Sequence, residues 1–313
     1  MFKQKFLSVV AAVLVVFLLA SCTWKEVEVR MKFAPEVGDV YQFSMTTDQT
    51  ITQVLEDQVA SMDQLMGFGF SFTATEEDDA GNVWVDVVYE WVQIQQSSDT
   101  GEVSYDSRDP SEEVDTLVSG FDALIGKGYA MQISPDGEIL DVVGLNEMIS
   151  EVMADVGIED AELLAQFEAQ FAEQYSEEAL REQVGNMLVE FPEGAVKIGD
   201  TWTASATSSN LVALNVDTIY TLVAFEGNIA TIDATSVISS SEDSMLDMGV
   251  YQIEYNLFGS QISTIYVDTA VGWSTNSIVT QTVTGDMIMR MNEDEVTIPL
   301  SIGSVVTMEM EEK

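Results

Sequence analysis

Apolar and polar residues alternate along most of this chain of 313 residues. Near its start, Val27, Val29, Met31 and Phe33 are separated by charged residues. A period of two residues is typical of a strand with one buried face. The same period predicts strands over residues 68–72, 83–91, 129–134, 138–143, 219–225, 229–237, 251–255, 262–267, 274–283, 287–291 and 296–308.

Two of these strands carry more specific predictions. Phe68, Phe70 and Phe72 share one face of their strand, while Gly67 and Gly69 occupy the other. Glycine inside a strand indicates a close approach by another group, so we expect something to pack tightly against the glycine face. In the next strand, the apolar residues at every second position are expected on a single face: Val83, Val85, Val87, Tyr89 and Trp91.

Turn sequences join several of the predicted strands. Residues 79–82 read Asp-Ala-Gly-Asn, residues 135–137 read Pro-Asp-Gly and residues 226–228 read Glu-Gly-Asn. These residue types favour tight chain reversals. Each turn is expected to close a hairpin, which makes the sheet antiparallel.

The period becomes helical after residue 144. Apolar residues three or four positions apart predict an amphipathic helix that ends at Gly157: Leu145, Met148, Ile149, Val152, Met153 and Val156. A second helix is predicted over residues 159–175, and a third begins with Ser176 as its cap and ends before Pro192. A shorter helix is predicted within residues 111–125.

The order of strands, helices and strands predicts an α+β protein that is mainly antiparallel β. We expect one large curved sheet with a helical insertion packed on its concave face. The expected divisions are a signal peptide at 1–21, a tether and first strand at 22–32, a strand-rich half at 33–144, the helical insertion at 145–191 and a second strand-rich half at 192–313, with residues 33–313 forming one composite domain.

A short motif occurs twice, once before each strand-rich half. Residues 38–44 read GDVYQFS and residues 199–205 read GDTWTAS. A duplication of the two halves is one explanation of the repeat. We interpret it first as a turn that leads a strand: the glycines allow positive φ, the aspartates close the turn, and the aromatic residues are expected to be buried at corresponding places. The residues concerned are Gly38, Asp39 and Tyr41, and Gly199, Asp200 and Trp202. The alternative places Asp39 and Asp200 at a shared rim as ligand contacts.

The first residues have the features of a bacterial secretion signal. Two lysines precede an apolar run from Phe6 to Ala20, which is shorter than a membrane span. The following Leu-Ala-Ser-Cys resembles a lipobox, which implies cleavage before Cys22 and acylation of that cysteine, for example with palmitate. Two or more acyl chains hold a protein on a membrane. Thr23 favours the outer membrane over the inner one as the site of anchoring.

The charge of the chain excludes some partners. It has 54 acidic and 11 basic residues and a formal net charge of −43. Such a chain repels nucleic acid, so no nucleic-acid partner is expected. Because 46% of its residues are hydrophobic, it is nevertheless expected to fold around a core. The acidity is typical of proteins from saline habitats, and a functional polyanion is the alternative.

The chain has no histidine and Cys22 is its single cysteine. Serine–histidine and cysteine–histidine catalysis and ordinary zinc sites are therefore excluded. No glycine-rich phosphate loop or EF-hand spacing is present. We expect a protein that is not an enzyme, with no cofactor and no dedicated metal site.

Methionine and phenylalanine recur on the alternating faces and on the predicted helices. Such residues most often fill a core, but they also line pockets for varied apolar ligands. Met287, Met289 and Met291 would also suit copper(I). The candidate lining comprises Phe68, Phe70, Phe72, Met148, Met153, Phe167, Phe171, Met187, Met287, Met289 and Met291.

Residues 191–202, FPEGAVKIGDTW, together with the lipobox and residues 33–41, resemble an uncharacterised family of bacterial envelope lipoproteins. By architecture the expected fold is also similar to the lipoprotein-carrier half-barrels. Neither resemblance implies a catalytic residue. We therefore expect a lipid-anchored protein of the cell envelope that binds an apolar or lipid-like ligand between the sheet and the helices. A structural or protein-interaction role with a packed interior is the alternative.

Overall fold

The computed structural model describes residues 27–55, 58–99, 101–109, 119–177, 179–181, 189–208, 213–241, 244–247, 252–291 and 294–311. Its dominant feature is one antiparallel sheet of 13 strands. The strands are β1 (Val40–Leu55), β2 (Gln58–Glu77), β3 (Val83–Ser98), β4 (Gly101–Asp106), β5 (Gly128–Ile133), β6 (Ile139–Val143), β7 (Thr201–Ser208), β8 (Leu214–Glu226), β9 (Ile229–Ser240), β10 (Met245–Asp247), β11 (Gln252–Asp268), β12 (Trp273–Met291) and β13 (Asp294–Met310). The helices are α2 (Ser119–Asp122), α3 (Leu145–Asp155) and α4 (Ala161–Gln174).

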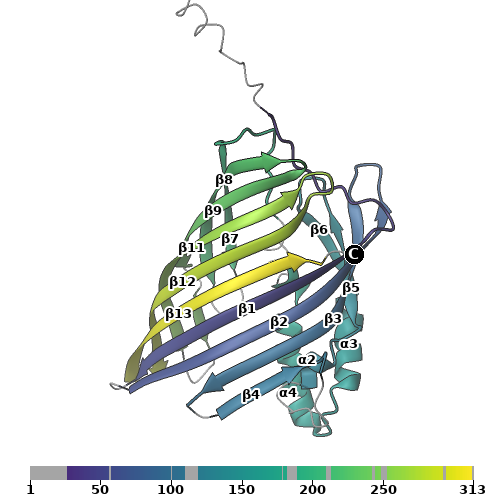
Figure 1. The fold of residues 1–313 in the computed structure, drawn as a ribbon. Helices are drawn as coiled ribbons and strands as arrows, with labels where there is room; N and C mark the ends of the chain where they lie inside the picture. The colour runs from purple at the N-terminus through teal and green to yellow at the C-terminus, as the bar shows by residue number, and fades with distance from the viewer. Residues whose placement is uncertain are drawn as a thin grey trace, which may run out of the picture.

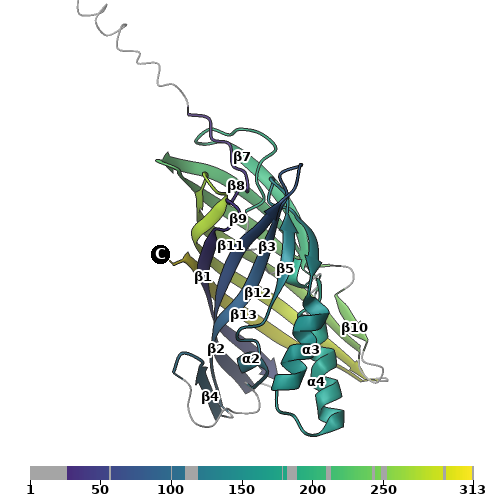
Figure 2. The same cartoon turned by 90° about the vertical axis from the view of Figure 1, so that its right-hand side faces the viewer.

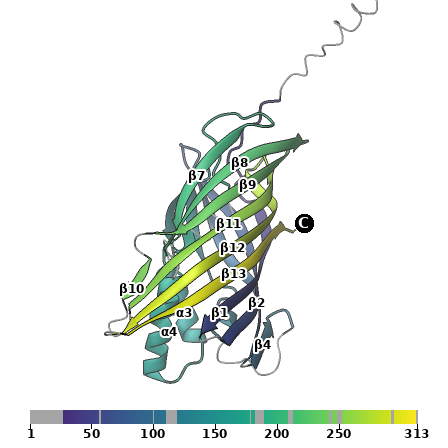
Figure 3. The same cartoon turned by 90° about the vertical axis from the view of Figure 1, so that its left-hand side faces the viewer.

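The strands run side by side in an oblique, curved array (Figure 1). Their order is β6-β5-β3-β2-β1-β13-β12-β11-β9-β8-β7, and β4 and β10 pair with β3 and β11. The sheet wraps into an open trough, whose two sides are seen in Figures 2 and 3. In the part of the chain that the structure describes, the end strands β6 and β7 do not pair with each other. This confirms the predicted α+β class, with a large curved antiparallel sheet.

Helices α3 and α4 stand against one end of the trough, beside β5 (Figure 2). Tyr175, which directly follows α4, stacks on Phe171 of that helix and lies 6.2 Å from Tyr89 of β3, measured between ring centroids. The helices therefore pack on one face of the sheet, as predicted. The described helices α3 and α4 stand at one end of the trough and do not extend along its whole concave face, as Figure 2 shows.

The predicted hairpins and the first two helices of the insertion are confirmed, whereas the third helix and the short helix within residues 111–125 lie partly outside the described residues. Residues 79–82 connect β2 to β3, residues 135–137 connect β5 to β6, and Gly227 lies in the turn between β8 and β9. Helix α3 ends just before Gly157, whose φ is 73°. The hydroxyl of Ser176 accepts a hydrogen bond from the amide of Ala179 at 3.3 Å, which fits its predicted role as a cap. Residues 182–188 lie outside the described chain.

Several predicted strands are segments of longer ones. The segments 251–255 and 262–267 both belong to β11, and the segments 274–283 and 287–291 both belong to β12. Gly259 and Gly285 lie between these segments and pair within the sheet. A glycine within a strand thus interrupts the hydrophobic pattern without ending the strand.

The segment of residues 27–36 is extended but is not a strand of the sheet. Its alternation is real, because Val29, Met31 and Phe33 are buried while the residues between them are exposed. Its single β-bridge joins Val29 to Val196, so the prediction of a first strand here is wrong. Phe33 instead fills part of the core. It is fully buried, and its ring packs edge-on against Trp273 with 4.8 Å between the ring centroids.

A β-bulge in β3 corrects the prediction for Trp91. Phe70 pairs with Tyr89 but Gly69 pairs with Trp91, so Glu90 is an extra residue. The extra residue reverses the alternation, because successive side chains point to opposite faces. Trp91 therefore leaves the inner face, and Val92 replaces it in the core. The indole lies over Gly67 and Gly69, which confirms the predicted close approach.

The two copies of the repeated motif form the same turn. Gly38 and Gly199 have φ of 99° and 95°. The amide of Gly38 bonds the carbonyl of Ala74 in β2, and the amide of Gly199 bonds that of Leu222 in β8, both at 2.7 Å. The returning bonds also correspond, from Ala74 to the carbonyl of Asp39 and from Leu222 to that of Asp200. The motif is thus a turn that places β1 beside β2 and β7 beside β8.

The aromatic residues of the motif are only half-buried, in contrast to the prediction. Tyr41 lies near Trp273, with 5.7 Å between ring centroids, and its hydroxyl donates to Asp39 Oδ2 at 3.0 Å. Trp202 stacks on Tyr220 at 5.4 Å, and its Nε1 donates to the carbonyl of Glu190 at 2.8 Å. Asp200 Oδ2 accepts from the amide of Lys197 at 2.9 Å. Both aspartates close turns, which favours the structural interpretation over a shared rim.

Candidate ligand-binding face

The concave face of the sheet has no charge over most of its area. Inward-facing positions are those that share the alternation of buried residues such as Phe43, Phe70 and Ile232. Away from the strand ends, the inward positions of β1, β2, β3, β8, β9, β11, β12 and β13 carry no acidic or basic residue. In a chain with 54 acidic residues, the charges of these strands therefore lie on the convex face and at the strand ends.

A row of uncharged polar residues crosses this face, and we call it the polar belt. Each member is the register partner of the next, so that adjacent strands contribute one residue each. From β3 to β8 the polar belt consists of Gln96, Gln64, Gln49, Ser304, Gln281, Gln261, Ser236 and Thr218.

Hydrogen bonds satisfy only part of the polar belt. The hydroxyl of Ser304 donates to Gln281 Oε1 at 3.2 Å, and the hydroxyls of Thr218 and Ser236 share a buried bond of 2.8 Å. Among the described residues, the remaining belt side chains make no hydrogen bond and are half-buried: Gln49, Gln64, Gln96 and Gln261. Their amides are thus free to bond water or a ligand.

The polar belt separates two apolar regions. On the side of the helices lies the main core, which contains the residues of β2, β3 and β5 together with α3, α4 and Trp273. On the other side lies a second cluster, built around Ile238, Leu257, Val283 and Leu300. Five further apolar residues pack against this second cluster and are half-buried: Ile51, Leu214, Val216, Tyr255 and Ile302.

The two regions differ in how well they are filled. In the main core, Phe68, Phe70 and Phe72 are each less than 10% exposed and make close ring contacts with Tyr89 and Phe43. Around the second cluster, apolar side chains remain partly open to solvent. An accessible apolar surface of the trough therefore lies beyond the polar belt, away from the helices.

A shallow hollow of about 320 Å³ lies near the β7 edge. It is lined by residues 203–205, 217–219 and 235–237, from β7, β8 and β9. Thr218 and Ser236, which end the polar belt, are among the lining residues. Asp217, Ile219, Thr235 and Val237 are exposed and alternate onto the convex face, so the hollow lies on the outer side of the sheet behind the end of the polar belt.

The predicted lining residues fall into separate places. The main core contains Phe68, Phe70, Phe72, Met148 and Phe171, and Met153 and Phe167 pack against it. Met287 and Met289 are half-buried and Met291 is exposed, all on the part of β12 beyond the second cluster. The structure does not bring these methionines to the phenylalanines, because the polar belt and the second cluster lie between them. Met187 and Cys22 lie outside the described residues.

The polar belt was not predicted from the sequence. The sequence does contain a signal for the belt, because glutamine or serine interrupts the apolar face of one predicted strand after another. Gln281, for example, lies between Val279 and Val283 in β12. The belt becomes visible only when the register of the strands is known, since its members come from positions 49 to 304.

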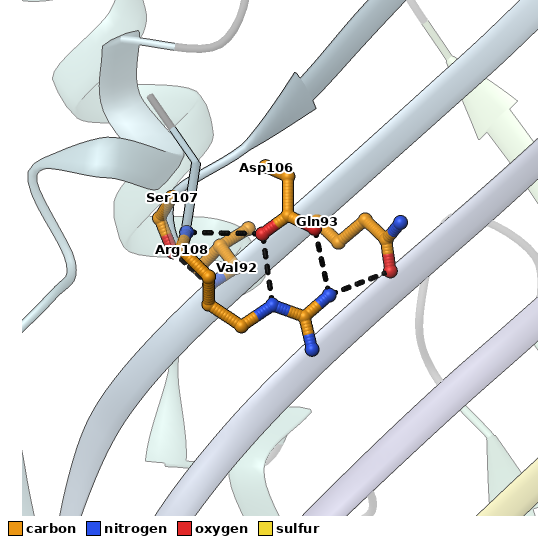
Figure 4. Close-up of polar contacts among 5 residues, drawn as sticks. All are labelled: Val92, Gln93, Asp106, Ser107 and Arg108. Atoms are coloured by element: carbon orange, nitrogen blue, oxygen red, sulfur yellow. Dashed lines mark hydrogen bonds and ion pairs between the residues drawn. The ribbon is translucent and has the colours of Figure 1, made fainter. Parts of the chain in front are cut away.

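On the convex face, a polar cluster fixes the β3 bulge (Figure 4). The guanidinium of Arg108 lies 4.0 Å from the centre of the Trp91 ring and donates to both oxygens of Asp106 and to Gln93 Oε1. The amide of Val92 donates to the hydroxyl of Ser107 at 2.9 Å. The hydrogen bonds from Arg108 lower the pKa of the Asp106 carboxyl. We interpret the cluster as structural, because its polar groups are satisfied by one another.

Three tyrosines are buried at the end of the trough that carries the helices. Burial raises the pKa of the phenols of Tyr89, Tyr129 and Tyr175. In the part of the chain that the structure describes, the hydroxyl of Tyr89 is buried without a hydrogen-bond partner. These groups stay protonated at neutral pH and do not form an acid–base pair.

The described residues contain neither a metal-binding cluster nor a membrane-spanning helix. No group of three or more histidine, cysteine, aspartate or glutamate side chains lies close enough together to hold a metal ion there. None of the helices described is long and apolar enough to cross a membrane.

Comparisons with known proteins identify a family and a fold. The profile of DUF6263, a family of unknown function, matches residues 80–274. No curated protein matches the sequence significantly. A solved structure on lipid–protein interactions in lipovitellin matches 88% of this chain with a TM-score of 0.50 and 9% sequence identity. The match spans 25% of the lipovitellin chain, and at this identity the likeness is one of fold alone.

Other solved structures match less well. An outer membrane channel of Pseudomonas putida F1 has 9% identity and a TM-score of 0.24, with 89% of this chain and 97% of the channel covered. A DUF1329 family protein of Desulfovibrio piger has 8% identity and a TM-score of 0.15, with 86% and 84% of the two chains covered. At these scores neither structure supports an argument about this chain.

Proposed function

The chain belongs to the DUF6263 family of unknown function, and we propose that it binds an apolar or lipid-like ligand on the concave face of its sheet. The observation that carries this proposal is the accessible apolar surface around the second cluster. Partly open apolar side chains on a concave, uncharged surface are the usual lining of a site for an apolar molecule. The likeness of the fold to lipovitellin, whose structure concerns lipid–protein interactions, also supports it.

The proposal differs from the expectation in where the ligand lies. The space between the sheet and the helices is filled by phenylalanine and tyrosine side chains, so we do not place the ligand there. The ligand instead lies along the trough beyond the polar belt, against Ile51, Ile302 and Tyr255. The helices then complete the folded core at one end of the trough.

We also propose that the protein is anchored by acyl chains on Cys22 and faces the envelope space outside the cytoplasm. Anchoring in the outer membrane would place the trough close to a source of lipid. Metabolic labelling with an alkyne-bearing palmitate tests the anchor. The chain should carry the label and fractionate with membranes, and Cys22→Ser should lose both properties. An unlabelled wild-type chain would refute the anchor.

A non-catalytic role completes the proposal. The chain has no histidine, and its single cysteine is the proposed lipid attachment point. Binding without chemical change needs only the surfaces described above. Recovery of a supplied lipid unaltered after incubation with the protein is the expected result.

A pair of variants on one strand tests the binding site. Ile302 is half-buried on the concave face of β13, and Val305 is 41% exposed on its convex face. Ile302→Glu should weaken uptake of a fluorescent acyl probe by about tenfold or more, because a carboxylate against an acyl chain loses its hydration. Val305→Glu is the matched control and should bind like the wild type. Equal binding by all three proteins would contradict the proposed site.

A further inference from the structure

The polar belt is not what folding alone favours at these positions. An antiparallel sheet with one buried face normally places apolar residues inward. Here most inward positions on both sides of the belt are apolar: Ile51 pairs with Met62 and Ile302 on one side, and Ile94 pairs with Met66 on the other. If the glutamine amides between such rows have no hydrogen-bond partner, the folded protein loses stability.

The chemistry of the belt selects one kind of partner. Glutamine side chains offer donors and acceptors, and serine and threonine hydroxyls offer both as well. None of the belt residues is charged, and the chain as a whole carries a formal charge of −43. An anionic group is therefore repelled by the surrounding field, and no belt residue offers it a counter-charge. Ester carbonyls and hydroxyls match the belt without a charge.

The position of the belt adds a second condition. The belt lies between two apolar regions, and successive inward rows along a strand are about 7 Å apart. A ligand along the trough that bonds the belt must therefore carry its polar groups between apolar parts or beside one. A hydrocarbon has no such groups, and a fatty acid carries its group at one end with a charge.

From these observations we propose that the polar belt binds the ester and hydroxyl groups of an uncharged acylglycerol lipid, whose acyl chains lie on the second cluster. This inference rests on the proposed function and names the ligand class for the same face. The unbonded amides of Gln49, Gln64, Gln96 and Gln261 are the groups that meet the ester region.

Photo-crosslinking with two probes tests this inference. The full-length chain is bound to phosphatidylcholine vesicles that contain either a diacylglycerol or an alkane of equal chain length, each with a diazirine. The wild type should crosslink to the diacylglycerol about fivefold more than to the alkane, as expected for one or two net hydrogen bonds. The crosslinked peptides should include β1, β12 and β13.

Two neighbouring glutamines supply the matched variants. Gln96 belongs to the polar belt, and Gln95 points from the convex face of the same strand. Gln96→Leu and Gln64→Met should remove the preference for diacylglycerol, while Gln95→Leu should retain it. Thermal melting of each variant confirms folding, and each belt variant is tested separately.

The outcomes separate the two proposals. If the wild type crosslinks equally to both probes, or if both belt variants retain the preference, the inference about the belt is wrong and ligand binding stands. If neither probe crosslinks to the concave face, the proposed function itself fails.

Discussion

Gly69 and Trp91 show how one residue depends on another across two strands. The indole of Trp91 occupies the space where a side chain at position 69 would lie, and Arg108 covers its other face. The two glycines in β2 were therefore informative in the sequence. The sequence did not show that Trp91 is the packing group, because the bulge at Glu90 moves Trp91 to the glycine face.

Gly69→Ala is expected to destabilise the protein by about 1–3 kcal/mol, because the new Cβ overlaps the indole. Urea unfolding measures the change. Gly303→Ala is the control: that position is also in a strand, and a Cβ there meets nothing within 4 Å. Equal stability of the two variants would contradict the packing described.

Tyr89 gives a second prediction at the residue scale. Its hydroxyl is buried without a partner among the described residues, so Tyr89→Phe should raise the free energy of unfolding by about 1 kcal/mol. Burial raises the folded-state pKa of Tyr89 above its ordinary value of 10.0. Below pH 10 both states keep the proton. Above about pH 10 only the unfolded chain loses it, so stability falls as the pH rises.

Unfolding at pH 8 and pH 11 measures both effects of Tyr89→Phe. The variant should be the more stable at each pH and should lose less stability between them. The variant should still lose some stability between pH 8 and pH 11, because burial also raises the pKa values of Tyr129 and Tyr175. An identical loss in both proteins would argue against a buried, protonated Tyr89.

At the scale of elements, most of the fold was accessible to sequence reasoning. The helical period of residues 145–156 and the turn residues at 135–137 gave α3 and the β5–β6 hairpin, because local periodicity and turn chemistry are sufficient there. The bulge and the bridge of Val29 depend on partners far along the chain, and no local pattern encodes them.

The segment of residues 27–36 is the element most in need of a test. Phe33 has no exposed surface and contacts Trp273, so Phe33→Ala should cost about 3–5 kcal/mol. The tryptophan emission of the folded variant should shift to longer wavelength as Trp273 becomes more solvated. Arg30→Ala, at an exposed position of the same segment, should change neither property. If Phe33→Ala lowers the free energy of unfolding no more than Arg30→Ala does, residues 27–36 do not form part of the core.

At the scale of the whole molecule, the curvature and the long-range register create the candidate site. The residues of the polar belt come from sequence positions as far apart as 49 and 304. They meet in one row because β1 pairs with both β2 and β13. The sequence predicted the residue types on each strand face, but not which strands lie side by side. The structure places the phenylalanines of the candidate lining in the packed core, and the surface where we place the ligand was not predicted from the sequence.

The distribution of charge leads to a prediction about salt. The chain has 54 acidic residues and its concave face carries no charge over most of its area, so repulsion within the sheet is concentrated on the convex face and the strand ends. Raising NaCl from about 0.05 M to about 1 M shortens the screening length to about 3 Å and should raise the melting temperature by several degrees. An unchanged melting temperature would argue against adaptation to a saline habitat and favour the functional polyanion.

The central claim is that the trough holds a ligand, and native mass spectrometry of the protein purified from its native host tests it most directly. The account predicts a non-covalent adduct with the mass of a lipid, which leaves on collisional activation while any covalent anchor remains. A chain without such an adduct, which also takes up no fluorescent lipid, would contradict the claim and favour a structural role with a packed interior.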